Sequence, residues 1–183
     1  MKKRFYIKTA FFSLAAMALL SSCLKDSRYI DYSKVGTLIE LPLAEVGDQA
    51  GIGGPFQTVT YSLAKGGTDT LTVAVNVASP KPLTSSLNVT LSATDLTALN
   101  AYNSANQTSY LPLPAADYTV LGSLTVTIPA NQRLGYAKFL INAAAIGIAN
   151  SGVYVLPVTI ESGGGQPIAQ PDKALMYNIV VNP

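Results

Sequence analysis

Strict alternation of apolar and polar residues is the feature that most constrains the fold of this 183-residue chain. It runs through residues 70–77, 87–94 and 123–128, where every second residue is apolar. A two-residue period places one face of a strand against a core and the other face in water. The abundant valine, isoleucine and threonine favour the same extended backbone. We therefore predict three half-buried β-strands here.

Five further segments with similar composition also predict strands. These segments are 37–43, 56–63, 134–142, 153–160 and 174–181. About eight short strands, separated by glycine, proline and asparagine, are typical of an antiparallel β-sandwich. The predicted fold class is therefore all-β, with a sandwich formed from antiparallel strands.

Three connections between these strands have readable turn residues. Lys65-Gly66-Gly67-Thr68 offers glycines that accept positive φ, so 56–63 and 69–79 are predicted to form a hairpin. Pro129-Ala130-Asn131 predicts a turn with a left-handed residue at Asn131. The glycines at 163–165 are predicted to be a flexible strand connection, since no phosphate-loop sequence follows them.

One segment between strands shows a helical period instead. Asp95 can cap a helix through its carboxylate, and apolar residues recur every third position over 96–102. The helix is expected to end near Asn103 or Asn106, because asparagine tolerates the left-handed conformation. A second helix, of one turn, is expected over 142–148.

The N-terminus has the three regions of a cleaved export signal. Four basic residues lie within positions 2–8, and an apolar run of eleven residues follows at 10–20. This run is shorter than the roughly 20 residues that span a bilayer. Leu20-Ser21-Ser22-Cys23 then resembles the lipobox of bacterial lipoproteins, which implies cleavage between Ser22 and Cys23 and acylation of the Cys23 thiol. The alternative is an ordinary secretory signal with an incidental cysteine.

Cleavage before Cys23 defines three parts of the chain. Residues 1–22 are the signal peptide, 23–36 the lipidated cysteine with a tether, and 37–183 a single β-sandwich domain. The precursor has 12 basic and 10 acidic residues, and four of the basic residues lie in the signal, so the mature chain has a net charge of −2. It shows no Lys or Arg cluster, and we expect no nucleic-acid partner.

The Lys25-Asp26 pair weakly resembles the charged export signal of surface-exposed Bacteroidetes lipoproteins. We therefore expect a lipid-anchored protein of the bacterial cell envelope, in the outer membrane and exposed at the surface.

Residue types that serve most catalytic and metal sites are missing. The chain has no histidine and one cysteine, Cys23, so it lacks the commonest general base and imidazole or further thiolate ligands. The mature carboxylates are Asp26, Asp31, Glu40, Glu45, Asp48, Asp69, Asp95, Asp117, Glu161 and Asp172. No D-x-D or D-x-E pair follows the tether, and glycoside hydrolysis needs two carboxylates about 5–9.5 Å apart. We expect no enzyme, no cofactor and no metal site.

Two stretches are candidates for binding or modification. Aromatic and amide side chains occur together over residues 102–110, which makes Asn103, Asn106, Gln107 and Tyr110 candidate glycan contacts. The alternative is that this stretch determines the fold, with Tyr102 packed inward and Asn103 capping the helix. Separately, Asp69-Thr70-Leu71 resembles the acceptor pattern of Bacteroidetes O-glycosylation, which implies a sugar on Thr70.

A series of short motifs runs from residue 102 to residue 158. They are Tyr102-Asn103, Asn106-Gln107-Thr108, Tyr110, Leu113-Pro114, Tyr118, Val126-Thr127-Ile128-Pro129-Ala130 and Tyr154-Val155-Leu156-Pro157-Val158. Over residues 37–160 they resemble an uncharacterised N-terminal domain of Bacteroidetes surface lipoproteins. The resemblance implies an immunoglobulin-like β-sandwich, and family members often precede a glycosidase-like or lectin-like domain. Asn131 departs from the commoner glycine, and no further domain is expected after Pro183.

These features together predict a lipid-anchored interaction module, accessory to glycan binding or capture at the surface. The alternative is a structural or protein-docking module, adhesin-like or pilus-like, that binds no glycan. The expected partners are membrane lipid through Cys23 and either a polysaccharide or a surface protein complex.

Overall fold

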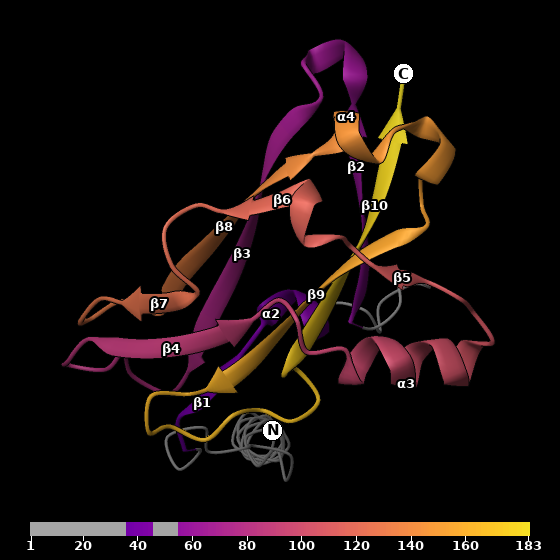
Figure 1. The fold of residues 1–183 in the computed structure, drawn as a ribbon. Coiled ribbons are helices and arrows are strands. Elements are labelled where there is room, and N and C mark those ends of the chain that lie inside the picture. Colours follow the sequence, from indigo (N-terminus) through magenta and orange to yellow (C-terminus); the bar gives the residue numbers. More distant parts are fainter. Residues whose placement is uncertain (1–35, 46–54) are drawn as a thin grey trace, which may run out of the picture. The chain divides into compact units, whose positions relative to one another are not determined.

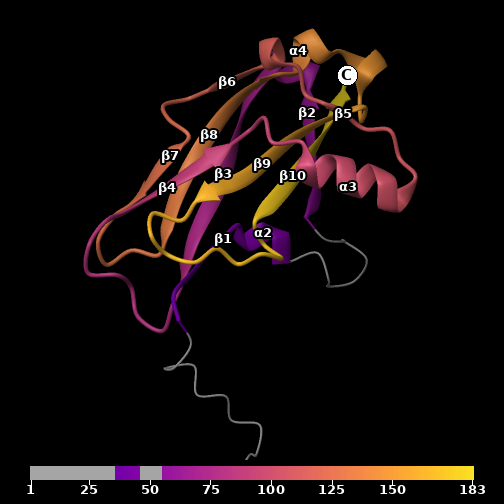
Figure 2. The same ribbon diagram turned by 60° about the horizontal axis from the view of Figure 1, so that its bottom comes forward.

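The computed structural model describes residues 36–45 and 55–183. The predicted signal peptide, Cys23 and the tether up to residue 35 lie outside these ranges. Val35–Pro183 form one compact unit, in which two β-sheets face each other (Figures 1 and 2). This arrangement confirms the predicted all-β sandwich. Within the described ranges, none of the helices is long and apolar enough to cross a bilayer.

The first sheet has four strands in the order β1-β3-β8-β6, and all neighbouring pairs are antiparallel. Its strands are β1 (Leu38–Glu40), β3 (Thr68–Ala78), β8 (Leu134–Asn142) and β6 (Tyr118–Val120). The β3–β8 ladder extends from the Thr68–Asn142 pair to the Asn76–Leu134 pair. β6 was not predicted, because three residues are too few to show a period.

The second sheet follows the order β2-β10-β9-β4-β7, and β5 pairs with β9 off this path. Its strands are β2 (Phe56–Ser62), β10 (Ala174–Asn182), β9 (Tyr154–Ser162), β4 (Leu87–Ser92), β7 (Thr125–Ile128) and β5 (Leu111–Pro112). β10 is antiparallel to β9 but parallel to β2, and β5 is parallel to β9. These two parallel pairs depart from the predicted antiparallel pattern, because no hairpin joins β2 or β5 to its partner.

The core lies between the two sheets. β3 buries every second residue from Leu71 to Val77, and β8 does so from Gly135 to Ile141. Phe139 of β8 is 0% exposed and is the largest fully buried side chain among the described residues. The alternation predicted for these strands is therefore confirmed, since burial of one face is what a two-residue period requires.

The predicted hairpin between 56–63 and 69–79 is wrong. β2 belongs to the second sheet and β3 to the first, so the intervening chain crosses from one sheet to the other. The crossing consists of the 3₁₀ helix η4 (Leu63–Lys65) and two glycines with positive φ, Gly66 at 99° and Gly67 at 71°. Glycine serves a hairpin and a sheet-to-sheet turn equally, and local sequence does not distinguish them.

The predicted strand 37–43 is also shorter than expected. β1 ends at Glu40, and the chain continues into the helix α2 (Pro42–Glu45). Pro42 suits the first helical position, where its missing N–H is not needed.

Helix α3 (Thr97–Asn106) lies along the outside of the second sheet (Figure 2). Asp95 Oδ1 accepts a hydrogen bond from the Thr97 N–H at 3.0 Å, although the cap position itself is Leu96. The helix ends at Asn106, as predicted, but the left-handed residue is Gln107 (φ 55°) and not an asparagine. At Pro129-Ala130-Asn131, in contrast, Asn131 adopts the predicted positive φ, 62°.

The remaining helical segments are short. They are η5 (Ala115–Asp117), α4 (Ala143–Ile146) and η6 (Ile148–Asn150). α4 is the predicted one-turn helix, and Asn142 Oδ1 caps it by accepting a hydrogen bond from the Ala145 N–H at 3.1 Å.

The glycine connection between β9 and β10 is set by packing as well as by turn geometry. Gly164 has φ 64°, and a Cβ placed on it would lie 2.3 Å from the Asn88 carbonyl oxygen. Only glycine permits this approach to β4, so the segment is closely packed at this residue.

Candidate functional site

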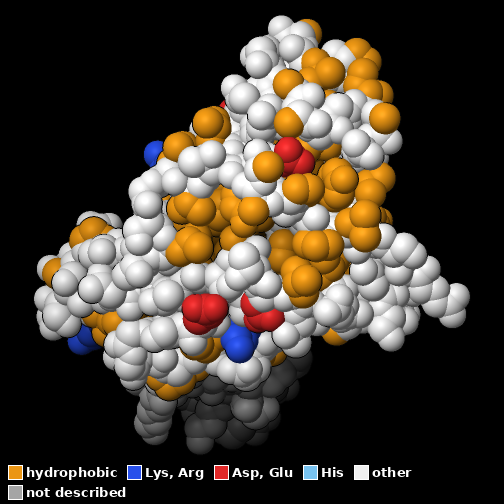
Figure 3. Space-filling model, in the orientation of Figure 1, with side chains coloured by type: hydrophobic (Ala, Val, Ile, Leu, Met, Phe, Trp, Pro, Cys, Tyr) orange, Lys and Arg blue, Asp and Glu red, His pale blue; other side chains and the backbone are white. Residues whose placement is uncertain are grey.

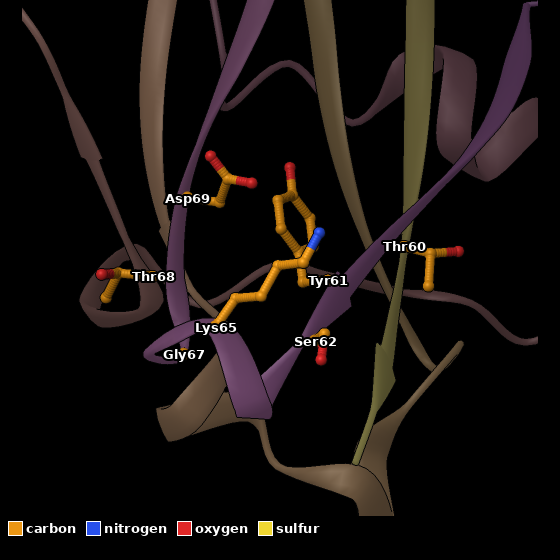
Figure 4. Close-up of a pocket in the computed structure, with 7 residues that line it drawn as sticks. All are labelled: Thr60, Tyr61, Ser62, Lys65, Gly67, Thr68 and Asp69. Carbon is orange, nitrogen blue, oxygen red and sulfur yellow. The ribbon is translucent and has the colours of Figure 1, made fainter.

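A pocket of about 490 Å³ opens between the end of β2 and the beginning of β3. Its lining residues are Thr60, Tyr61, Ser62, Lys65, Gly67, Thr68 and Asp69. Figure 4 shows that they come from β2, the η4 turn and β3. Because the turn joins the two strands, it closes the pocket at that end.

The pocket lies where, among the described residues, two strand edges have no neighbouring strand. β2 pairs with β10 on one side, and in the described part of the chain no strand pairs with its other edge. On β3, β1 covers only Asn76–Ala78, so within residues 36–45 and 55–183 the first part of β3 pairs with β8 alone. These edges belong to different sheets and flank a seam of the sandwich.

The turn that closes this seam is firmly packed. Gly67 is buried, its carbonyl oxygen accepts a hydrogen bond from the Ala144 N–H at 2.9 Å, and a Cβ on Gly67 would lie 2.8 Å from the Ala144 Cβ. α4 therefore holds the η4 turn against the fold, and the pocket has a fixed floor.

Three ionisable side chains extend into the space between β2 and β3: Tyr61, Lys65 and Asp69 (Figure 4). One oxygen of Asp69, Oδ1, accepts a hydrogen bond from the Thr70 N–H at 2.7 Å. Within the described ranges, no ion pair joins Lys65 to Asp69 or to another carboxylate. Both charges therefore stay available to a ligand.

Burial changes the acidity of the tyrosine at the pocket and of one behind it. It raises the pKa of Tyr61 to about 12, and the negative charge of Asp69 adds to the rise. The Tyr177 hydroxyl is fully buried and has no hydrogen-bond partner among the described residues. Burial raises its pKa as well, with a further contribution from Tyr61. Both side chains are therefore neutral hydroxyls at physiological pH.

These shifts predict an alkaline loss of stability. The folded pKa values lie above the ordinary tyrosine value of about 10, so the unfolded chain releases protons that the folded chain retains. The free energy of unfolding should hold below about pH 10 and fall as the pH rises toward about 12. Urea denaturation at several alkaline pH values measures this fall.

The double variant Tyr61→Phe/Tyr177→Phe should show a flatter alkaline profile than the wild type. Tyr136→Phe is the control, since Tyr136 is 54% exposed. An identical fall in the wild type and the double variant contradicts the assignment to these two hydroxyls.

The structure places the four candidate glycan residues at the C-terminal end of α3 and the chain after it, not in this pocket. Asn103 Oδ1 accepts hydrogen bonds from Thr108 Oγ1 at 2.9 Å and from the Tyr110 N–H at 3.1 Å. Asn103 Nδ2 donates to the Tyr110 carbonyl oxygen at 2.9 Å. The side chain of Asn103 thus ties the loop to the helix.

The aromatic residues of this region form a cluster. Phe56 stacks on Tyr102 with ring centroids 4.5 Å apart and planes 10° apart, and Tyr110 lies 4.9 Å from Phe56. The cluster packs against a small apolar core of Leu99, Val155 and Met176. The rings of Tyr102 and Tyr110 therefore fasten α3 to the second sheet.

The other two candidate glycan residues, and Thr70, are exposed. Asn106 Nδ2 donates to the Tyr102 carbonyl oxygen at 2.9 Å, and Gln107 occupies the left-handed cap. Thr70, the candidate O-glycosylation site, is exposed on β3 next to Asp69.

Replacing Asn103 by alanine should destabilise the domain by about 1–3 kcal/mol, because the loop loses three hydrogen bonds and keeps partly buried polar groups. Asn106→Ala is the matched control, with an expected change within about 0.5 kcal/mol. Urea denaturation of both variants measures the difference. Equal stability of the two variants would show that the Asn103 bonds contribute little.

Sequence reasoning did not find the pocket. It treated Lys65 to Thr68 as a hairpin turn and made no site prediction for Tyr61, whose side chain is 7% exposed in the structure. One feature of the sequence could have indicated the site: Lys65 and Asp69 stand on either side of two glycines. The same arrangement is common in ordinary turns.

Among the described residues, no group of three His, Cys, Asp or Glu side chains is placed to hold a metal ion. The pKa of the Asp95 carboxyl group is lowered, chiefly by hydrogen bonds from the side chain and backbone of Thr97. The shift therefore follows from the position of Asp95 just before α3, where its carboxylate accepts hydrogen bonds from the first helical residue.

The chain is similar to a known domain family and to several solved structures. A family model described as a "-like, N-terminal domain" matches residues 48–167. A candidate carbohydrate-binding protein from Bacteroides ovatus is 16% identical with a TM-score of 0.54, and the alignment covers 68% of this chain and 35% of that one. A search of curated proteins gave no match.

Two further solved structures are similar. EndoBT-3987 from Bacteroides thetaiotamicron, with a Man5GlcNAc product, is 19% identical with a TM-score of 0.53, and the alignment covers 70% of this chain and 29% of that one. An auxiliary nutrient binding protein from Bacteroides thetaiotaomicron VPI-5482 is 17% identical with a TM-score of 0.53. That alignment covers 83% of this chain and 47% of the other. This chain thus spans less than half of each of these structures, and the likeness is one of fold.

Proposed function

Because the chain belongs to the Bacteroidetes N-terminal domain family whose model covers residues 48–167, we propose that it is a lipid-anchored interaction module of the cell envelope, accessory to glycan binding or capture. The observation that carries the proposal is the shared sandwich. The same fold forms part of Bacteroides proteins named for carbohydrate binding, nutrient binding and a glycan product.

Composition supports binding rather than catalysis. The chain has no histidine, and the pocket contains one carboxylate, Asp69, where glycoside hydrolysis needs two. One face of the molecule carries few charged side chains and no large patch of one sign (Figure 3), which fits a neutral partner better than nucleic acid. Acylated Cys23 would hold the module at the outer membrane, exposed at the surface.

Retention on immobilised polysaccharides tests the glycan role. The full-length protein in detergent is passed over a panel of plant and host polysaccharides, with bovine serum albumin as the control. We expect selective retention on at least one of them. Failure to be retained on any polysaccharide, and failure to bind soluble oligosaccharides at about 1 mM, a free energy of only about −4 kcal/mol, would refute the glycan role.

The β2 edge favours a second candidate, a structural or protein-docking module of the adhesin-like or pilus-like kind. Its sequence, Phe56–Ser62, has no charged residue and no proline. Natural proteins usually protect an unpaired strand edge with such residues, and an extended segment of a partner can add to an unprotected edge. Cross-linking in intact cells tests this candidate. A protein that cross-links to the wild type but not to the Thr58→Lys variant, while polysaccharide retention of the variant is unchanged, favours docking.

A further inference from the structure

The pocket between β2 and β3 has polar groups that the fold leaves unused. Asp69 Oδ1 is bonded to Thr70, whereas Oδ2 has no hydrogen bond within the described ranges. The Lys65 amine likewise has no partner in the part of the chain that the structure describes, whereas the side chains of Thr60 and Thr68 point away from the pocket (Figure 4). The side chains that point into the pocket thus offer a carboxylate oxygen from Asp69, an ammonium group from Lys65 and a hydroxyl from Tyr61 (Figure 4).

The charges of these groups restrict the ligand. An anionic ligand would meet the carboxylate of Asp69, and a cationic ligand would meet the ammonium of Lys65. A neutral ligand with several hydroxyl groups suits both, because a carboxylate accepts from ligand hydroxyls and an ammonium donates to their oxygens. Hydrogen bonds to charged groups are also the stronger ones, at about 1.5–3 kcal/mol each.

The size and shape of the pocket restrict the ligand further. Its volume of about 490 Å³ falls within the roughly 300–1,000 Å³ of small-molecule sites. The η4 turn closes one end, so a chain cannot pass through, and the end of a chain can enter. The Tyr61 ring is 7% exposed and offers little face for stacking, so hydrogen bonds must supply most of the affinity.

The geometry points to a binding site for one terminal, uncharged sugar unit, in which Asp69 and Lys65 contact the sugar hydroxyls. This inference rests on the proposed glycan role and names the site and the ligand class. Asp69 Oδ2 accepts from a hydroxyl group of the sugar, Lys65 donates to a hydroxyl oxygen, and the Tyr61 hydroxyl lies between these two side chains (Figure 4).

The test is saturation-transfer difference NMR on the full-length protein in detergent. The probes are methyl α-D-mannopyranoside, methyl β-D-glucopyranoside and N-acetylglucosamine, with glycine as a zwitterionic probe. We expect at least one sugar to bind with a Kd near millimolar, and Asp69→Ala and Lys65→Met to weaken it about tenfold or more. Glu161→Gln and Lys81→Met are the matched controls, since both residues are exposed and lie outside the pocket lining.

Each other outcome has a distinct meaning. Sugar binding that survives both pocket substitutions overturns the site and leaves the glycan role standing. Polysaccharide retention without binding of any of the three sugars also overturns the site alone. Glycine binding that depends on Asp69 and Lys65, with no sugar bound, overturns the ligand class. Absence of both sugar binding and polysaccharide retention refutes the site and the proposed function together.

Discussion

Replacing Cys23 by alanine is expected to move the protein from the membrane fraction to the soluble fraction. The physical reason is the lipid: each buried methylene contributes about 0.8 kcal/mol, and a single acyl chain holds a protein only marginally, so stable anchoring needs the two or three chains of a lipoprotein cysteine. No other cysteine exists in the chain to take them. Fractionation of cells that express each form, with immunoblotting, measures the shift.

The matched control is Lys25→Ala, two residues after the cysteine, which should still sediment with membranes. Mass spectrometry of the wild type should show cleavage before Cys23 and the added mass of acyl chains. A Cys23→Ala variant that still sediments with membranes, together with a wild type of unmodified mass, contradicts the anchor.

The second large effect concerns the core. Phe139→Ala should lower the free energy of unfolding by about 3–5 kcal/mol, because removing a buried ring loses its transfer free energy and leaves a cavity. Phe139 is 0% exposed, and its ring centroid lies 6.1 Å from that of Tyr118 on the neighbouring strand β6. Urea denaturation of purified variants measures the loss.

Tyr136→Ala is the control on the same strand. Tyr136 is also aromatic but 54% exposed, so its loss should change stability by about 0.5 kcal/mol or less. Similar losses for both variants would mean that the β8 alternation does not separate core from solvent.

The prediction of strands from the sequence succeeded where the period was long. The alternating residues of β3 and the segment of β8 were correctly located, because burial of one sheet face imposes the two-residue pattern directly. β6 and β5 were missed, since strands of three and two residues leave no period. Their position depends on β8 and β9, which lie elsewhere in the chain.

The main error of the sequence-based prediction was in which strands pair with each other. The segments 56–63 and 69–79 read as a hairpin, yet β2 pairs in parallel with β10, more than a hundred residues later. Hydrogen bonds between strands are almost independent of side-chain identity, so the local sequence of β2 does not encode its neighbour. At the end of α3, Gln107 adopts the left-handed conformation because the Asn103 bonds fix the loop, although asparagine has the higher local preference.

By itself, the sequence determined the all-β class, the strands with long alternation and the shortage of catalytic side chains, because these depend on residue type and period alone. It also predicts the cleavage and acylation at Cys23. Only the tertiary structure decided that β2 and β3 lie in different sheets, and that the seam between their edges brings Tyr61, Lys65 and Asp69 to one pocket. The reason is physical: a pocket forms where chain segments meet, and that meeting depends on the packing of the whole sandwich.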